Sequence, residues 1–291
     1  MKRPRFVVFS VRAAPAFFRE STVFIDRARR GVLKYKESKY GGAFPFSREL
    51  DDMFELNIEK SWCDAVYARS SVRKYTGAPD KAQLDRLGVL CRKLSWQGVT
   101  VRMFKGPGLR SQIKGTDVYA VIIAKQGTPM EVEGFMGEAL VLEATAMGLS
   151  TCWLGAGFYP DVISRNVELK NDEAVHCVIA LGKAELPPFA PKRKPLEKVC
   201  GMSEAQLAEL GAWQKEAVLA ARLAPSAMNL QPWKITADKT SVTIEEPQAV
   251  LYKKYAQIDR GICMLHAAVG AFKAGRKATF KKVEGGYAMK A

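Results

Sequence analysis

The sequence has few residues of the kinds that enzymes use for catalysis without a cofactor. Only two histidines, His176 and His266, occur among 291 residues, and neither accompanies a cluster of carboxylates. The sequence therefore predicts neither a metal site nor a Ser–His–Asp triad. Each histidine lies in an apolar run, so we expect both to pack in the core. If the protein is an enzyme, a cofactor must carry the chemistry.

Long apolar runs and paired cysteines are missing as well. No stretch reaches the length of about eighteen apolar residues that a membrane-spanning helix needs, so we expect no membrane association. The six cysteines form no CxxC pair and several lie in apolar runs, which indicates buried, reduced thiols in a cytoplasmic protein. A signal peptide is not expected, because Arg12 interrupts the apolar stretch near the N-terminus.

Positive charge, by contrast, is abundant. The formal net charge of +15 is compatible with a nucleic-acid-binding role. The lysines and arginines are spread along the chain rather than gathered in one block, however, and a basic surface also attracts small phosphorylated molecules. We therefore expect a small-molecule partner and no nucleic acid. A nucleic-acid binder would be recognised by an affinity that falls steeply with salt concentration.

Residues 1–52 differ in composition from the rest of the chain. They are rich in Lys and Arg, show no sustained helical or strand period, and are broken by glycines and prolines. We expect them to form an extension outside the fold, with Met53 as a possible true start of the protein. A mitochondrial-type presequence is the alternative, because acidic residues are scarce at the beginning.

After Met53 the expected elements occur twice in the same order. Ser61 is the expected N-cap of a short helix at 62–69, and Asp80 with Gln83 and Ser203 with Gln206 are capping-box patterns. The first set continues with strands at 98–104 and 117–125, a long buried helix at 131–149, a glycine turn at 152–158 and a strand at 174–182. The second set has a helix to about Leu223, a hairpin at 233–246 and a long buried helix at 260–275. Between them, 183–198 has the composition of a linker.

This repetition has two explanations. Amphipathic helices resemble one another by chance, and the two capped helix starts share only a few identical residues. The repeated order of helix, strands and central helix favours a duplication, with residues 53–190 and 191–291 as two similar halves.

Two short motifs indicate a binding site for a phosphate and a planar molecule. In Ala68-Arg69-Ser70-Ser71-Val72-Arg73, guanidinium and hydroxyl groups gather where a helix gives way to extended chain, and these are the groups that bind phosphate. A solvated basic helix end is the alternative. In the segment APSAMNLQPWK at 224–234, two prolines restrain a loop of small polar residues that can offer backbone groups and an Asn amide to a planar polar edge. An ordinary helix-to-strand connection is the alternative there.

These segments together resemble the nitroreductase superfamily of FMN-dependent oxidoreductases. RSSVRKY is similar to the RRSxRxY phosphate motif of that family, and APSAMNLQPWK is similar to its PSxxNxQPW loop. EALVLEATAMGLSTCWLGAGF resembles the central helix with the glycine turn that follows it, and APKRKPLEKV resembles the basic tail segment that returns to the phosphate. The resemblance covers the chain from about Met53 to the C-terminus, and the loop is its most specific part.

The chain departs from the usual pattern in the spacing of the two motifs. Family members carry the loop shortly after the phosphate motif and form homodimers, whereas here the loop follows in the other half of the chain. KLSWQGVTV stands where the first half would carry a loop, and no RxSxR precedes Ser203. The resemblance is therefore to the tandem, single-chain branch, in which one flavin site forms between the halves of a monomer with an internal pseudo-two-fold axis.

The resemblance implies an α+β, nitroreductase-like fold in two similar halves. Each half would contain a mainly antiparallel sheet flanked by helices, with a long buried central helix. Arg69 and Arg193 would bind the FMN phosphate with Ser71 and Lys192, and Arg73 would lie near the ribityl chain and the N1–O2 edge. The full set implied for the flavin is Arg69, Ser70, Ser71, Arg73, Leu154, Gly155, Lys192, Arg193, Pro225, Ser226, Ala227 and Asn229.

The implied reaction needs no side chain as acid or base. NADH or NADPH would give hydride to flavin N5 and leave, and a nitroaromatic or quinone-like acceptor would then take the electrons in a ping-pong cycle. A flavin-binding carrier or sensor without turnover is the alternative. The acceptor and the choice between NADH and NADPH cannot be predicted, because variable loops contact the substrate in this family.

Overall fold

The computed structural model describes two central helices, two larger antiparallel sheets, a small three-stranded sheet and the segments between them. The described residues are 56–96, 98–106, 109, 112–155, 158–184, 192–246 and 253–291, with the strands β1 (Val7–Phe9), β2 (Val23–Ile25), β3 (Leu33–Tyr35) and β4 (Met53–Phe54). Strands β1–β3 pair with one another in an antiparallel sheet. The rest of the expected extension lies outside the described residues, as does the expected boundary between the halves at 190–191.

The first sheet is antiparallel throughout. Its strands are β5 (Tyr75–Gly77), β6 (Val99–Lys105), β7 (Val118–Lys125), β8 (Ser150–Leu154) and β9 (Glu173–Ala184). The order is β5-β9-β7-β6, and β8 also pairs with β9. The prediction of a glycine turn beginning at Cys152 was wrong, because the chain stays extended and bonded to β9 as far as Leu154. Gly155 follows the strand, and 156–157 lie outside the described residues.

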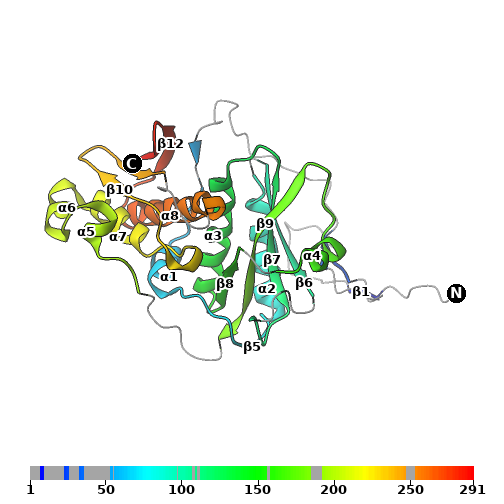
Figure 1. The fold of residues 1–291 in the computed structure, drawn as a ribbon. Coiled ribbons are helices and arrows are strands. Elements are labelled where there is room, and N and C mark those ends of the chain that lie inside the picture. The colour runs from blue at the N-terminus through cyan, green and yellow to red at the C-terminus, as the bar shows by residue number, and fades with distance from the viewer. Residues whose placement is uncertain are drawn as a thin grey trace, which may run out of the picture.

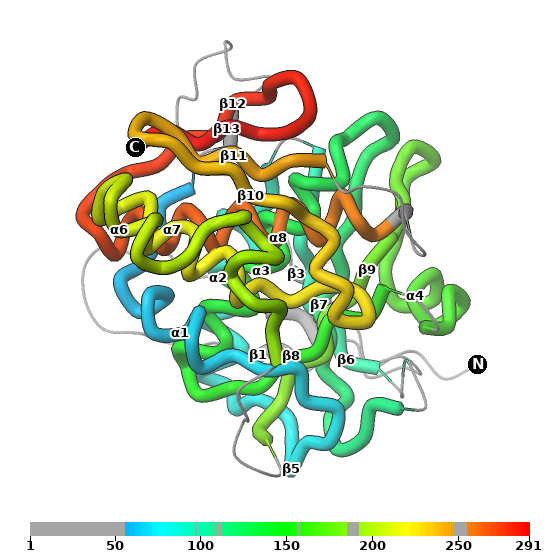
Figure 2. The backbone as a smooth tube through the Cα atoms, turned by 60° about the vertical axis from the view of Figure 1, so that its left-hand side comes forward, coloured from blue at the N-terminus to red at the C-terminus, as the bar shows by residue number. Residues whose placement is uncertain are grey.

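The second sheet is also antiparallel. It contains β10 (Ile235–Ala237), β11 (Val242–Glu245), β12 (Thr279–Val283) and β13 (Gly286–Lys290), in the order β10-β11-β13-β12, with β4 at its edge. The two sheets share a strand order. In each, a hairpin (β6–β7 or β10–β11) is followed by the last strand of the sheet along the chain (β9 or β13). That strand pairs in turn with the strand that precedes it in sequence (β8 or β12). Figure 2 shows the second sheet at the top of the molecule and β5, at the edge of the first sheet, at the bottom.

Among the described residues, six shorter α-helices surround the centre. They are α1 (Trp62–Ala68), α2 (Lys81–Lys93), α4 (Pro160–Asn166), α5 (Leu196–Cys200), α6 (Glu204–Leu210) and α7 (Ala212–Arg222). Both predicted capping boxes are confirmed: Asp80 and Ser203 each accept from the backbone N–H of the residue three positions on, whose side-chain oxygen accepts from the cap backbone.

Three predictions about the helices were wrong. Ser61 precedes α1 but makes no side-chain capping bond. The single helix expected to run to Leu223 is two helices, because Gly211 has a φ of 143°, which interrupts the helical backbone between α6 and α7. The expected linker overlaps α5 at 196–198, because the chain becomes helical directly after Pro195.

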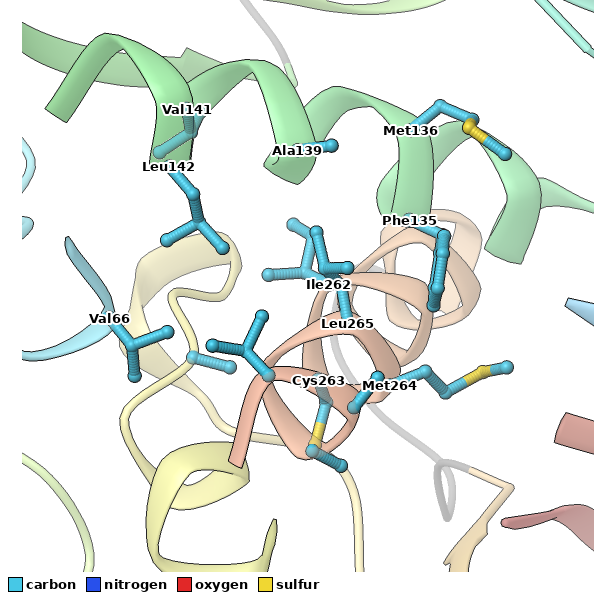
Figure 3. Close-up of a cluster of buried hydrophobic side chains, with 14 of the residues drawn as sticks. Val66, Phe135, Met136, Ala139, Val141, Leu142, Ile262, Cys263, Met264 and Leu265 are labelled. Carbon is cyan, nitrogen blue, oxygen red and sulfur yellow. The ribbon is translucent and has the colours of Figure 1, made fainter. Parts of the chain in front are cut away.

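The two long apolar helices pack against each other in the core. They are α3 (Met130–Ala146) and α8 (Lys253–Lys273), and α3 lies between the first sheet and α8 (Figure 1). Figure 3 shows Ala139 and Leu142 of α3 facing Ile262 and Leu265 of α8. A single apolar cluster continues from these helices into both sheets, where Phe135 of α3 meets Phe280 of β12 edge to face.

Glycines allow the two helices to approach at backbone distance. A Cβ atom on Gly134 would lie 2.0 Å from the carbonyl oxygen of Ile258, and one on Gly261 would lie 2.0 Å from that of Glu131. Each glycine therefore contacts the carbonyl three residues before the other glycine, so the contact is reciprocal. Any larger residue at either position would push the helices apart.

Cysteines and histidines follow the predictions with two exceptions. All six cysteines lie among the described residues and none forms a disulfide; five are buried, whereas Cys63 is half-buried. His266 is fully buried as predicted, but the His176 side chain is 37% exposed and its Nδ1 lies 2.8 Å from Glu133. Among the described residues, none of the helices combines the length and apolar character that crossing a membrane requires.

Candidate functional site

The segment that carries the predicted phosphate motif is held between a helix end and a strand. The backbone N–H of Arg69 closes the last turn of α1 on Ala65, and the chain then becomes extended. Ser71 forms a parallel bridge to Thr151 of β8, and the N–H of Val72 donates to the Thr151 carbonyl at 2.9 Å. The motif therefore runs beside the start of β8, with its backbone fixed on both sides.

The Arg69 side chain is buried with unused hydrogen-bond donors. It is only 3% exposed, and Nη2 makes one long bond of 3.4 Å to Ser71 Oγ. Its Nε and Nη1 have no hydrogen-bond partner among the described residues, and neither does the hydroxyl of the adjacent, buried Ser70. Burial lowers the pKa of Arg69, and the nearby carboxylate of Glu138 opposes that shift. Buried donors without partners are costly, so these atoms mark a place where an anion would be stabilised.

Arg193 lies in the basic segment before α5 and is bound quite differently. Its Nε and Nη2 donate to the carbonyl of Leu223 at 3.1 and 2.8 Å. Its Nη1 donates at 3.1 Å both to the Lys192 carbonyl and to Asn229 Oδ1. Burial, together with the positive charge of Arg69, lowers the pKa of Arg193 to about 10. The charges of the two arginines therefore act on each other, although Arg193 already uses most of its donors.

The predicted loop at 225–229 has a rigid shape. Ser226 Oγ accepts from the N–H of Gln231 at 2.8 Å, and the N–H of Ala227 lies 3.1 Å from both carboxylate oxygens of Asp259 in α8. Burial raises the pKa of Asp259 to about 7, against the effect of the Ala227 N–H. Met228, Asn229 and Gln231 have φ values of 52°, 56° and 45°, a left-handed backbone that costs free energy for non-glycine residues. The surrounding bonds hold the loop in this conformation.

Further bonds fasten this loop to the basic segment before α5. Asn229 Nδ2 donates to the Lys192 carbonyl at 3.1 Å, and Gln231 Oε1 accepts from the N–H of Lys194 at 2.9 Å. Lys194 Nζ donates to the Gln231 carbonyl, and Arg222 Nε donates to the Lys194 carbonyl at 2.7 Å. Residues 192–194 and 225–231 thus form one hydrogen-bonded unit, which we call the clamped loop.

The remaining predicted residues fall into two groups. Pro225 is buried behind the loop, and Leu154 is buried at the end of β8. Gly155 follows β8 directly, and a Cβ atom there would lie 3.0 Å from the ring of Tyr255, so the end of β8 lies against α8. Arg73 is exposed, and its backbone carbonyl accepts from the N–H of Lys114. The structure therefore brings Arg69, Arg193 and the loop together but leaves the Arg73 side chain in solvent.

Several residues of this region were not among the predicted set. Glu138, Trp153 and His266 form a buried polar cluster behind Arg69, and Asp259 and Gln231 hold the loop. A sequence signal did exist for the acidic residues: a carboxylate within an apolar helix must find polar partners. Which partners it finds could not be predicted, because they come from distant parts of the chain.

A surface cleft of about 320 Å³ adjoins the clamped loop. It is lined by Lys194, Leu230, Gln231, Pro232, Trp233, Lys234 and Glu246. None of the predicted flavin-binding residues lines it. The arrangement of unused donors at Arg69 is chemically more informative than this cleft, because it is those donors that require a polar ligand.

Comparison with known proteins identifies relatives of this chain. A family model described as "Putative TM nitroreductase" matches residues 62–271. The structure is similar to that of a "putative nitroreductase" from Thermotoga maritima, with 23% sequence identity, a TM-score of 0.59, and coverage of 84% of this chain and 98% of that chain. An FMN-dependent nitroreductase from Clostridium difficile is 17% identical, with a TM-score of 0.38 over 44% of this chain and 90% of that chain. No curated protein matches the sequence.

Proposed function

Because the chain belongs to the family described as "Putative TM nitroreductase", we propose that it is an FMN-dependent oxidoreductase. It would use NADH or NADPH to reduce a small organic acceptor, nitroaromatic or quinone-like. The observation that carries this proposal is the pair of unused, buried Arg69 donors, Nε and Nη1, beside a second guanidinium. Two guanidinium groups and a buried hydroxyl are a suitable donor set for a phosphate monoester.

The residues present fit the phosphate end of FMN. Arg69 and Ser70 offer buried donors that have no protein acceptor among the described residues, and Arg193 adds positive charge. Ser71 lies within reach of Arg69 Nη2, so it would share the same anion. We assign Lys192, whose side chain is exposed, to the edge of this site. Asn229 would act by keeping Arg193 in place, because its side-chain oxygen accepts from Nη1.

The loop and the strand end would hold the rest of the cofactor. We assign Pro225, Ser226 and Ala227 to the cover over the flavin, together with Leu154 and Gly155 of the first half and Arg73 at its rim. When bound, FMN would supply the hydride chemistry that the side chains of this region do not. The protein would contribute binding, orientation and positive charge, which favours an electron-rich ligand.

We further propose that the chain is a tandem duplication with one flavin site. Three observations support this: the shared strand order of the two sheets, the two capping boxes, and the reciprocal glycine contact between α3 and α8. Arg69 belongs to the first half, and the clamped loop belongs to the second. Linking the halves makes their association intramolecular, with an effective concentration on the order of millimolar, so a monomer suffices.

The function is tested by adding FMN to the purified full chain and recording its absorption spectrum. A bound flavin spectrum, followed by oxidation of NADH or NADPH in the presence of a quinone or nitroaromatic acceptor, is the expected result. Flavin binding without turnover over a broad set of acceptors would indicate a carrier or sensor instead. Absence of flavin binding would contradict the proposal.

The single-chain site is tested by mixing two variants, Arg69→Ala and Asn229→Ala. If each site is built within one chain, every chain in the mixture carries a defect and FMN binding stays impaired after joint refolding. Recovery of near-normal binding in part of the mixture would mean that sites form between two chains.

A further inference from the structure

Glu138 is a carboxylate in the middle of α3 with no access to solvent. Its Oε2 accepts from Trp153 Nε1 at 2.7 Å, and its Oε1 lies 2.8 Å from His266 Nε2 and 3.8 Å from Arg69 Nε. Its side chain is 0% exposed, and those of His266 and Arg69 are 0% and 2% exposed. Burying a carboxylate so completely costs several kcal/mol unless charges and donors compensate it.

The distance between Glu138 and Arg69 is that of an ion pair without a hydrogen bond. A guanidinium that serves only to neutralise a carboxylate makes short, often bidentate bonds to it. Here the carboxylate oxygens are taken by His266 and Trp153, so the Arg69 donors Nε and Nη1 stay unused. Glu138 thus stabilises the charge of Arg69 without occupying the atoms that would bind a ligand.

His266 connects Glu138 to the backbone of α7. His266 Nδ1 lies 3.2 Å from the carbonyl of Ala220, which can only accept, so Nδ1 carries a hydrogen. Ala220 lies near the end of α7, shortly before the clamped loop. His266 is therefore fixed at both ring nitrogens, and it holds Glu138 at a constant position relative to Arg69.

If α3 and α8 are exchanged with each other, the positions of Glu138 and His266 correspond to apolar residues. Gly134 and Gly261 occupy equivalent positions, because each contacts the carbonyl three residues before the other. Four residues after Gly134 and Gly261 stand Glu138 and Leu265, respectively. Five residues after them stand Ala139 and His266, respectively. The polar pair Glu138–His266 thus has the buried apolar pair Leu265–Ala139 as its counterpart. The carboxylate is present only on the side that carries Arg69.

We propose that Glu138 is a resident counter-ion of the anion site, which stabilises Arg69 in the absence of a ligand and competes with the ligand's phosphate for it. The inference rests on the proposed function, because it requires Arg69 to be the phosphate-binding group. The charge of Glu138 also opposes the lowering of the pKa of Arg69 and of Arg193 that burial causes, so it acts on both guanidinium groups. A built-in carboxylate of this kind lowers affinity for the phosphate but keeps the unliganded protein folded.

The test is the variant Glu138→Gln, compared with the wild-type full chain. Glutamine has nearly the same shape and can still accept from Trp153 Nε1, so the negative charge beside Arg69 is removed with little change in side-chain volume. Without ligand, the variant should melt about 4 °C lower, because Arg69 then lacks compensation. FMN, followed by quenching of flavin fluorescence, should bind about tenfold more tightly, which equals about 1.4 kcal/mol. Inorganic phosphate should raise the melting temperature of the variant more than that of the wild type.

A second glutamate of α3 provides the matched control. Glu143 is also buried and also accepts from a tryptophan, Trp62 Nε1, at 2.8 Å, while Arg86 Nε donates to it at 2.6 Å. Glu143→Gln should lower stability without changing FMN affinity. If Glu138→Gln does not fold, Glu138→Asp keeps the charge but withdraws it from Arg69, and FMN should still bind more tightly than in the wild type.

Failure of the counter-ion proposal can be distinguished from failure of the proposed function. If the wild type binds FMN through Arg69 but the Glu138 variants bind it equally or more weakly, the counter-ion proposal is wrong and the proposed function stands. If the wild type binds no FMN and phosphate does not raise its melting temperature, the proposed function fails and the counter-ion role fails with it.

Discussion

Two regions of the molecule contribute arginines to the candidate site, but the hydrogen bonding of these arginines differs. The segment at 69–71 contains an arginine and a serine that are buried with unused donors. In the clamped loop, Arg193 donates to three different oxygens and Asn229, Gln231 and Lys194 bond to one another. The first region is ready for a ligand, and the second is already complete as protein structure. The same residue type, arginine, therefore keeps unused donors in one region and holds the protein structure together in the other.

The largest expected effect concerns how the clamped loop depends on pH. The pKa of Asp259 is raised to about 7 by burial, whereas in an unfolded chain it is about 3.9. The folded state thus binds this proton more tightly, so the stability that the proton provides is lost as pH rises from about 4 through about 7. Between pH 5 and pH 8, the free energy of unfolding of Asp259→Asn should rise relative to the wild type by roughly 3 kcal/mol, measured by urea unfolding.

Asp238→Asn is the control for this pH dependence. Bonds from the Thr240 side chain and backbone lower the pKa of Asp238 to about 2, so its stabilising effect is lost only in acid. The difference between this variant and the wild type should therefore stay constant from pH 5 to pH 8. Parallel curves for Asp259→Asn and the wild type would show that Asp259 does not titrate in this range.

The second prediction distinguishes Arg193 from Arg69 by its effect on the stability of the ligand-free protein. Arg193→Ala removes the bonds to Leu223, Lys192 and Asn229, and we expect it to lower the free energy of unfolding of the ligand-free protein by about 2–3 kcal/mol. Lys192→Ala removes a positive charge from the same segment but leaves these bonds in place, so it should change stability little. Equal stability of the Arg193→Ala and Lys192→Ala proteins in urea would show that Arg193 does not hold the loop.

The third prediction distinguishes Arg69 from Arg193 by its effect on FMN affinity. Arg69→Ala should weaken FMN binding by about 1.5–3 kcal/mol, the usual value of a hydrogen bond to a charged group. Arg165→Ala removes an exposed arginine of α4 that pairs with Asp161, and it should leave the FMN affinity unchanged. Calorimetric titration of each variant with FMN gives the comparison, and an unaltered dissociation constant for Arg69→Ala would remove Arg69 from the site.

The smallest effect is expected from truncation at Met53. Strand β4 begins at this residue and pairs with β12, so a chain starting there keeps every strand of the second sheet. We expect the shortened protein to fold and to bind FMN like the full chain. Its flavin affinity and its melting temperature are the measurements, and aggregation under conditions where the full chain stays in solution would assign residues 1–52 to the fold.

Features that depend on neighbouring residues were predictable from the sequence. The two capping boxes were found because each depends on residues three positions apart, and both central helices were found from their apolar runs. The end of β8 was not found, because pairing with β9 rather than the local glycine pattern decides where the strand stops. The break at Gly211 was not found either, since one glycine inside a helical pattern is often tolerated.

The candidate site was predictable in its members but not in its bonding. The motifs named Arg69, Arg193 and Asn229, and the structure places Arg193 against Asn229 and near Arg69. That Arg193 would be saturated by carbonyl groups and Arg69 left with free donors depends on contacts between distant segments. Glu138 was hidden for the same reason, because its partners His266 and Trp153 lie on other elements.

We propose that a single anion site, with its free donors on Arg69 and its cover in the clamped loop, binds one FMN in each chain. Titration of the purified full chain with FMN, followed by flavin absorption and fluorescence, tests this directly. The predicted result is saturation at one FMN per chain. Saturation at two equivalent FMN molecules per chain, or no saturable binding, would contradict the claim.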